Sequence, residues 1–177
     1  MPSLGFCVIR RSQVQWYCTM KVNVVGKKLS VADRAYSAGF LDADGAIMAT
    51  IEHHKEKKFR FRVRVILKIT QRERKILDWF LTSFGVGYIR KNRTTFDWIM
   101  RDQQIVYLVL KRMIPYLKVK RKQADIAQDI LTANIKTKDD LIAVARLADA
   151  LSRFNVRSQN RRKNFAAMIQ DSFSSND

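Results

Sequence analysis

Acidic residues are scarce in this chain: 16 aspartates and glutamates stand against 34 lysines and arginines among 177 residues. The formal net charge at pH 7 is therefore +18. Such an excess argues against an enzyme that handles small uncharged metabolites. It favours a polyanionic partner, with DNA or RNA before an anionic membrane surface, although a generally basic, solvated protein has the same composition.

Long apolar runs are also missing, because lysine or arginine interrupts each of them, and this excludes a membrane span. No apolar stretch precedes a small-residue cleavage site, so we expect no secretory signal. Cysteine and histidine are rare, with two of each. Cys7 and Cys18 predict reduced thiols rather than a disulfide framework or a zinc site. The adjacent His53 and His54 would point to opposite faces of a strand, so we expect no shared metal.

Apolar residues make up 47% of the chain, which is enough for a packed core in a protein of about one domain. Basic residues gather in several separate segments, and residues 1–32 and 111–122 contain no acid. This pattern suggests one folded surface assembled from distant parts of the chain. We expect residues 1–30 to form a poorly ordered N-terminal extension, 31–170 a single domain and 171–177 a frayed tail.

The clearest periodic stretch covers residues 58–70, where apolar residues occupy every second position from Phe59 to Ile69. Period two predicts a half-buried strand with one face in a core. Five cations on the other face would repel one another unless an anion lay along them. We therefore expect this face in the major groove of duplex DNA, the alternative being a solvated edge strand. The five cations are Lys58, Arg60, Arg62, Arg64 and Lys68.

Helical periods predict most of the other elements. A helix over 31–41 carries small residues at its centre, which would allow a second helix to approach and offset the cost of Gly39, about 1 kcal/mol relative to alanine. A capping box from Thr70 to Glu73 predicts a helix that ends at residues 85–87. A hairpin with strands 88–91 and 95–100 follows. Further helices are expected at 103–114, 119–134, 137–152 and 158–170, which gives an α+β domain.

Residues 37–45, SAGFLDADG, resemble the LAGLIDADG signature of homing endonucleases at six of nine positions. Phe40 and Leu41 are apolar replacements, and Ser37 replaces a leucine without touching a catalytic group. A basic strand, Gln71 and the segments 85–90 and 115–124 follow in the order typical of the single-motif, homodimeric group. The resemblance, which covers about residues 31–165, implies an αββαββα core with a saddle-shaped antiparallel sheet, here with extra C-terminal helices.

The resemblance implies hydrolysis of DNA phosphodiester bonds with Mg²⁺ or another divalent cation. Such an ion supplies a nucleophilic water and stabilises charge on the leaving oxygen. Asp44 and the main-chain carbonyl of Ala43 would hold it, Gln71 would orient water, and Lys120 would lie near the scissile phosphate. Lys75 is the expected second basic residue, with Arg74 as the alternative because the segment from residue 71 to 85 is shorter than the family pattern.

Residues expected to contact DNA share the outer face of the basic strand, the turn before it, or the hairpin. Arg62, Arg64 and Lys68 are the best candidates for guanine, and Arg60 is an alternative phosphate contact. Asp97 is expected to orient a neighbouring arginine or to accept a hydrogen bond from cytosine. The complete set is Thr50, Glu52, His54, Glu56, Lys58, Arg60, Arg62, Arg64, Lys68, Tyr88, Arg90, Asn92, Arg93, Asp97 and Trp98. Residues 157–163 are expected to touch the DNA backbone.

One motif per chain implies a homodimer, because cutting both strands needs two active sites. Its interface would comprise Ala35, Ala38, Gly39 and Asp42, and Asp42 is otherwise expected to be structural. The expected function is a double-strand break at a long, pseudo-palindromic DNA site. The alternatives are an intron-encoded RNA maturase or a DNA- or RNA-binding protein without cleavage. We expect an organelle, either chloroplast or mitochondrion, or the cytoplasm of a prokaryote.

Overall fold

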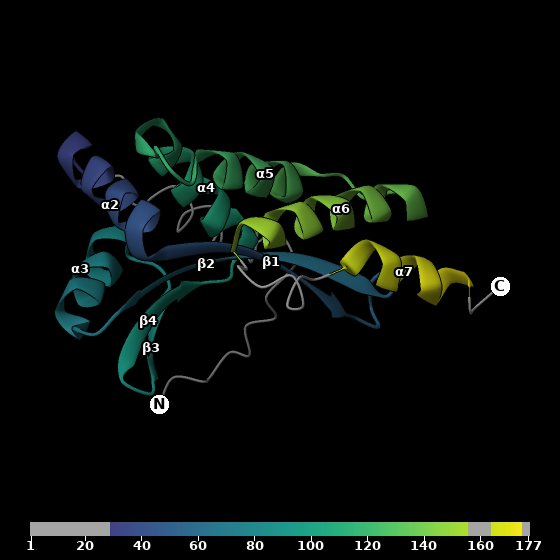
Figure 1. The fold of residues 1–177 in the computed structure, drawn as a ribbon, viewed down its shortest axis with the longest axis horizontal. Helices are drawn as coiled ribbons and strands as arrows, with labels where there is room; N and C mark the ends of the chain where they lie inside the picture. Colours follow the sequence, from purple (N-terminus) through teal and green to yellow (C-terminus); the bar gives the residue numbers. More distant parts are fainter. Residues whose placement is uncertain (1–28, 156–163, 175–177) are drawn as a thin grey trace, which may run out of the picture.

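A computed structural model describes residues 29–155 and 164–174, and in it the helices pack on one face of an antiparallel sheet (Figure 1). The expected order of helices and strands, αββαββα followed by extra C-terminal helices, is confirmed. The elements are α2 (Val31–Asp44), β1 (Gly45–His53), β2 (Phe61–Gln71), α3 (Arg74–Phe84), β3 (Tyr88–Asn92), β4 (Thr95–Met100), α4 (Gln103–Met113), the 3-10 helix η1 (Ile114–Tyr116), α5 (Arg121–Thr132), α6 (Lys138–Asn155) and α7 (Phe165–Ser174).

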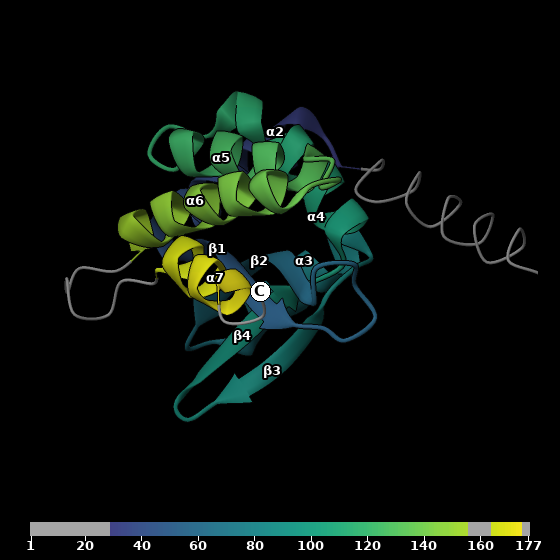
Figure 2. The same cartoon turned by 90° about the vertical axis from the view of Figure 1, so that its right-hand side faces the viewer.

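The sheet has the strand order β1-β2-β4-β3. Ile47 lies opposite Leu67, and Ile69 lies opposite Trp98, and all four side chains are buried toward the helices. Because side chains alternate along a strand, every second residue points away from the helices, and we call this the outer face. Figure 2 shows α5 and α6 above the sheet, with the β3–β4 hairpin extending away from them.

The ends of the domain differ from the expected boundaries. Leu29 is buried in the core, and the Ser30 hydroxyl caps α2 in a capping box with Asp33, so both belong to the folded part. Residues 171–174 are helical rather than frayed, and Phe173 packs against Phe59 and Phe61. Residues 1–28, which include both cysteines, and the basic segment 157–163 lie outside the described residues. In the described part, no helix is both long and apolar enough to cross a bilayer.

Two local predictions were wrong. Thr70 does not cap a helix, because β2 continues through Gln71 and α3 begins at Arg74 after Glu73, whose side chain makes no capping bond. The basic strand begins at Phe61 rather than residue 58. Residues 54–60 form the turn from β1, closed by the hydrogen bond from the His54 amide to the Arg60 carbonyl at 2.7 Å. Chain reversal needs the left-handed conformation at Arg60 (φ 59°), which a strand excludes.

Candidate active site

Asp44 and Gln71 meet at one end of the sheet. Asp44 is the exposed last residue of α2, and β1 starts immediately after it. Gly45 pairs with Ile69, so β2 continues two residues past this pair and brings Gln71 beside Asp44. The Gln71 Nε2 group donates a hydrogen bond of 2.6 Å to Asp44 Oδ2. The expected carboxylate and amide are therefore in direct contact.

Asp42 attaches the loop before α5 to the end of α2. Its carboxylate accepts hydrogen bonds from the backbone N–H groups of Lys118 (2.7 Å), Val119 (3.2 Å) and Lys120 (2.8 Å). Burial alone would raise the pKa of Asp42, but these bonds and the charge of Lys120 lower it below its ordinary value. The carboxylate is thus engaged within its own chain, which fits a structural role.

Lys120 is held against the same stretch of α2, because its Nζ group donates a hydrogen bond to the Asp42 carbonyl. Burial lowers the pKa of Lys120, and the negative charges of Asp42 and Asp44 oppose that effect. An ammonium group beside Asp44 is placed to stabilise negative charge that develops there. Asp44, Gln71 and Lys120 thus come together from three segments far apart in the sequence.

The donor set at this end of the sheet fits a hard divalent cation. Asp44 offers an exposed carboxylate, and Ala43 offers an adjacent main-chain carbonyl. No group of three or more histidine, cysteine, aspartate or glutamate residues gathers anywhere in the described part of the chain. Mg²⁺ uses few protein oxygens and keeps waters and phosphate oxygens as its other ligands.

The second basic residue lies at the start of α3. Arg74 is paired with Asp78 at 3.1 Å, one turn further along the helix. Lys75 is exposed and is the better candidate, because its ammonium group has no such partner in the described structure. Neither residue makes a hydrogen bond or ion pair with Asp44 within the described residues. Lys75 therefore stays a prediction.

The outer face carries most of the expected cations. Arg64 is diagonally opposite Glu52, with Nη2 and Oε2 3.7 Å apart, and its side chain is 20% exposed. The strand register places the following predicted residues on this face: Thr50, Glu52, Arg62, Arg64, Lys68, Tyr88, Arg90, Asn92 and Asp97. His54 and Glu56 lie in the β1–β2 turn, and Arg93 lies in the β3–β4 turn.

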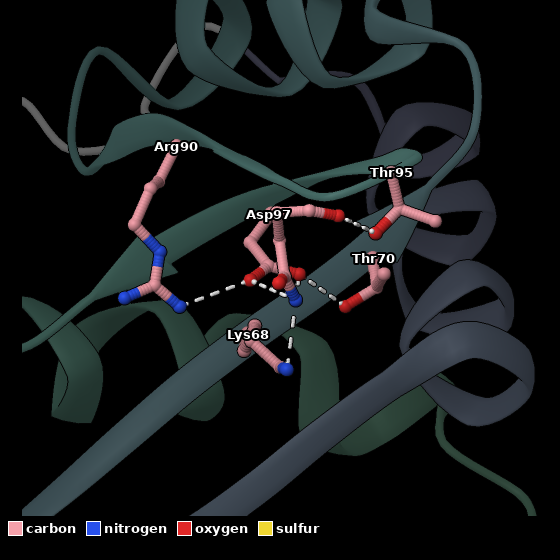
Figure 3. A network of polar contacts seen from close by, with 6 residues as sticks. Lys68, Thr70, Arg90, Thr95 and Asp97 are labelled. Carbon is pink, nitrogen blue, oxygen red and sulfur yellow. Dashed lines mark hydrogen bonds and ion pairs between the residues drawn. The ribbon is translucent and has the colours of Figure 1, made fainter.

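Asp97 is the centre of a polar network on this face (Figure 3). Its carboxylate is fully buried and accepts hydrogen bonds from Thr70 Oγ1 at 2.6 Å and Arg90 Nη2 at 3.2 Å, with a weaker one from Asn92 at 3.4 Å. Lys68 Nζ lies 3.7 Å from Oδ1. Of the two expected roles, orienting Arg90 fits this geometry. Accepting a bond from cytosine does not, because the carboxylate is enclosed by groups of its own chain.

Thr70 is a residue that the sequence reasoning missed in this role. The signal was available, because the period-two pattern of β2 places residue 70 on the same face as Arg64 and Lys68. Thr70 was missed because it was assigned as the N-cap of a helix rather than as a residue of the strand. The Thr70 hydroxyl and the Asp97 carboxylate instead join β2 to the hairpin.

Replacing Asp97 with asparagine should lower the free energy of unfolding by about 1–3 kcal/mol at pH 7, since bonds to a charged group are lost. Burial tends to raise the pKa of Asp97, but Thr70, Arg90 and Lys68 together lower it below 3.8. The folded protein therefore favours the ionised form, and this stability is lost as pH falls below that value. Urea unfolding between pH 7 and 3 should show wild type and variant converging at low pH. A constant difference would contradict an ionised native Asp97.

One expected DNA contact, Trp98, was wrong, and two others, Lys58 and Arg60, lie off the outer face and stay predictions. Trp98 is 1% exposed, and its Nε1 group donates to the Val86 carbonyl inside the core, so it cannot reach DNA. Lys58 donates to the carbonyl of Lys136, which lies just before α6 and therefore on the helix side. Arg60 lies outside the strand, in the β1–β2 turn. The cationic row is therefore shorter than the sequence alternation predicted.

The face of α2 also needs correction. Ala38 is fully buried against the chain's own core, so it does not belong to a surface for a partner. Ala35 and Gly39 are exposed one turn apart, and a Cβ atom added at Gly39 would meet nothing within 4 Å. Val31 and Tyr36 on the same helix are 64% and 49% exposed. The Tyr36 ring packs edge to face against Phe40 and Trp79, so the part of α2 that stays open in the described chain is the row of Val31, Ala35 and Gly39.

Comparison with known proteins agrees with the geometry. The sequence model of the family described as LAGLIDADG endonuclease matches residues 37–130. The DNA endonuclease I-CreI of Chlamydomonas reinhardtii is 30% identical over 125 residues, which cover 68% of this chain and 77% of that protein. The DNA endonuclease I-CvuI of Chlorella vulgaris is 34% identical over 121 residues, which cover 65% and 74%.

Solved structures extend the similarity to the fold. I-CvuI in complex with the I-CreI target has a TM-score of 0.73 and 28% identity, over 81% of this chain and 94% of that one. The archaeal intron-encoded I-Vdi141I complexed with DNA has a TM-score of 0.70 at 17% identity, over 80% and 94%, and shares the fold. With the motif, the fold and the meeting of Asp44, Gln71 and Lys120 in agreement, this chain belongs to the LAGLIDADG endonuclease family.

Proposed function

We propose that this chain is a site-specific DNA endonuclease that hydrolyses phosphodiester bonds with Mg²⁺ or another divalent cation. The observation that carries the proposal is the 2.6 Å contact between Gln71 and Asp44 at one end of the cationic outer face of the sheet. The relatives named DNA endonucleases support it. Structures of I-CvuI with DNA targets, uncleaved in the presence of Mg and also determined with Ca, support the binding of DNA.

In the proposed mechanism, Asp44 and the Ala43 carbonyl would hold the cation at the sheet end. When bound, such a cation activates a water and neutralises phosphate charge. The Gln71 amide fixes the Asp44 carboxylate through Nε2, and its carbonyl oxygen remains to orient the attacking water. Lys120, held by the Asp42 carbonyl, stabilises negative charge on the phosphate as the bond breaks.

We further propose that two copies act together. One chain offers one Asp44 site, whereas a double-strand break needs two. The exposed surface of α2 around Ala35 and Gly39 suits an isologous contact between identical helices. Such a pair would place the two outer faces along one duplex and would recognise a pseudo-palindromic site.

The sequence pattern placed Arg64 and Lys58 on the same face of one strand, whereas the structure places only Arg64 there. Substitutions at these two residues therefore distinguish the two arrangements. Replacing Arg64 with alanine should weaken target binding about tenfold or more and relax base preference, because Arg64 lies on the outer face. Replacing Lys58 with alanine should change binding less than about twofold, because Lys58 points to the Lys136 carbonyl. Both affinities can be measured by fluorescence anisotropy with a labelled duplex that contains a sequence cut by the wild type. Equal losses of affinity in the two variants would show that both cations contact the DNA.

The proposed activity is tested by incubating the full chain with a supercoiled plasmid library in Mg²⁺, in Ca²⁺ and in EDTA. We expect linear plasmids with Mg²⁺ and intact plasmids with EDTA. Equal cutting with EDTA would contradict the proposed use of a divalent cation. Salt-sensitive DNA binding without any cutting would instead indicate a binding protein of the same fold.

A further inference from the structure

A second basic surface lies at the end of the sheet away from Asp44, where β1 ends and β2 begins. The β1–β2 turn, α6 and α7 surround an open pocket of about 420 Å³, here called the distal pocket. Figure 1 places α7 at the end of the molecule opposite α2. Its lining includes three cations and three aromatic rings: Lys58, Arg60, Lys138, Phe59, Phe61 and Phe173.

The rings and the cations of the distal pocket contact one another. The Lys138 ammonium lies 4.9 Å from the centre of the Phe173 ring, and the Lys58 ammonium lies 5.1 Å from that of Phe59. Phe173 meets Phe59 and Phe61 edge to face, with centroids 6.5 and 6.4 Å apart. All three rings are partly exposed, and no aspartate or glutamate lines the pocket.

A neighbouring hollow of about 350 Å³ shares Lys58, Phe59 and Phe61 with the distal pocket. It adds Lys57 and Arg62 to the lining, again without an acidic residue. The basic, aromatic lining therefore continues from the distal pocket along the β1–β2 turn and the start of β2. His53 and Phe61 share the inward parity of Ile47 and Leu67 and so lie on the helix side of the sheet, whereas Arg62 belongs to the outer face.

We propose that the distal pocket binds single-stranded nucleic acid, with bases on the phenylalanine rings and phosphates at the lysine and arginine side chains. Cations that follow the backbone, combined with aromatic rings for stacking, are the usual means of binding an unpaired strand. The bases of a duplex are stacked on one another and cannot lie on these rings. The distal pocket is also separate from Asp44, so this binding does not depend on cleavage.

The test uses the full chain and short labelled oligothymidylate and oligouridylate in fluorescence anisotropy. Phe173→Ala and Lys138→Glu should each raise the Kd for both strands about tenfold, since they remove a stacking ring or reverse a cation. Cleavage of duplex DNA by both variants should stay at the wild-type rate. Tighter binding of oligouridylate than of oligothymidylate would identify RNA as the preferred strand, and equal binding would support either strand as ligand.

Lys111→Glu is the matched control, because Lys111 also places its ammonium over a ring, that of Tyr107, at 5.9 Å on α4. This control should leave strand binding near the wild-type level. An equal loss with Lys111→Glu would overturn the proposal in favour of diffuse charge attraction. Displacement of the strand by cleavable duplex would overturn it in favour of the outer face. Lys138→Glu decides the matter if Phe173→Ala unfolds α7, which circular dichroism detects.

Discussion

Replacing Asp44 with asparagine is expected to lower the rate of DNA cleavage by about a thousandfold or more, with target binding changed by less than about twofold. Asparagine has the same shape and keeps an oxygen that can accept the hydrogen bond from Gln71 Nε2. It lacks the charge that holds a divalent cation. Asp44 lies at the end of the sheet, whereas the cations that would bind DNA are spread along it, so affinity should survive.

The matched control is Asp129→Asn, which removes an equal charge from an exposed position on α5. Single-turnover cleavage and anisotropy should be measured for both variants in Mg²⁺ and in Ca²⁺. Near-normal cleavage by Asp44→Asn would contradict the proposal that Asp44 binds the divalent cation. Loss of binding by a folded Asp44→Asn variant would show that Asp44 acts in DNA recognition.

Replacing Gly39 with leucine is expected to convert a dimer into monomers and to abolish double-strand cutting. Within one chain the new side chain has room where it leaves the helix, because residue 39 is exposed and a Cβ there meets nothing within 4 Å. Helix propensity even favours the variant, by up to about 1 kcal/mol relative to glycine. A second copy of α2 packed against Gly39 would instead collide with the new side chain. Gly39→Leu should therefore stabilise a chain that is a monomer and destabilise a dimer that pairs through α2.

Analytical ultracentrifugation and thermal unfolding at several protein concentrations measure this effect. Ala143→Leu is the control, since it adds the same exposed side chain at a helical position on α6. We expect Ala143→Leu to stay dimeric and Gly39→Leu to sediment as a monomer that no longer makes double-strand cuts. A dimeric and fully active Gly39→Leu variant would place the interface on another surface.

Much of the fold is predictable from the sequence because its signals are local. The helical periods and the hairpin predicted most of the elements, and the family resemblance supplied their full order. The first helix was predicted to end at residue 41, but α2 continues to Asp44. The β1–β2 turn was not predictable, because the alternation of apolar and basic residues continues through Phe59 and Arg60. Only the pairing of His53 with Phe61 fixes where the strand begins.

The candidate site likewise has a part that could be predicted from the sequence and a part that could not. Asp44, Gln71 and Lys120 could be selected from the motif and its spacing, yet the attachment of Asp42 to the loop at Lys118 joins segments far apart in sequence. The side on which Trp98 lies is fixed by the strand register, which pairs it with the buried Ile69 and puts its neighbour Asp97 on the outer face. The inward orientation of Ala38 likewise depends on which side of α2 the core covers.

The most direct test of the central claim is to sequence the ends produced from a plasmid library of randomised, pseudo-palindromic sites by wild type and by Asp44→Asn. We expect discrete double-strand breaks, made by wild type alone, at sites whose halves are related by two-fold symmetry. Breaks by both proteins would contradict the role of Asp44. An absence of breaks from wild type, with salt-sensitive binding of DNA or preferential binding of RNA, would contradict the endonuclease itself.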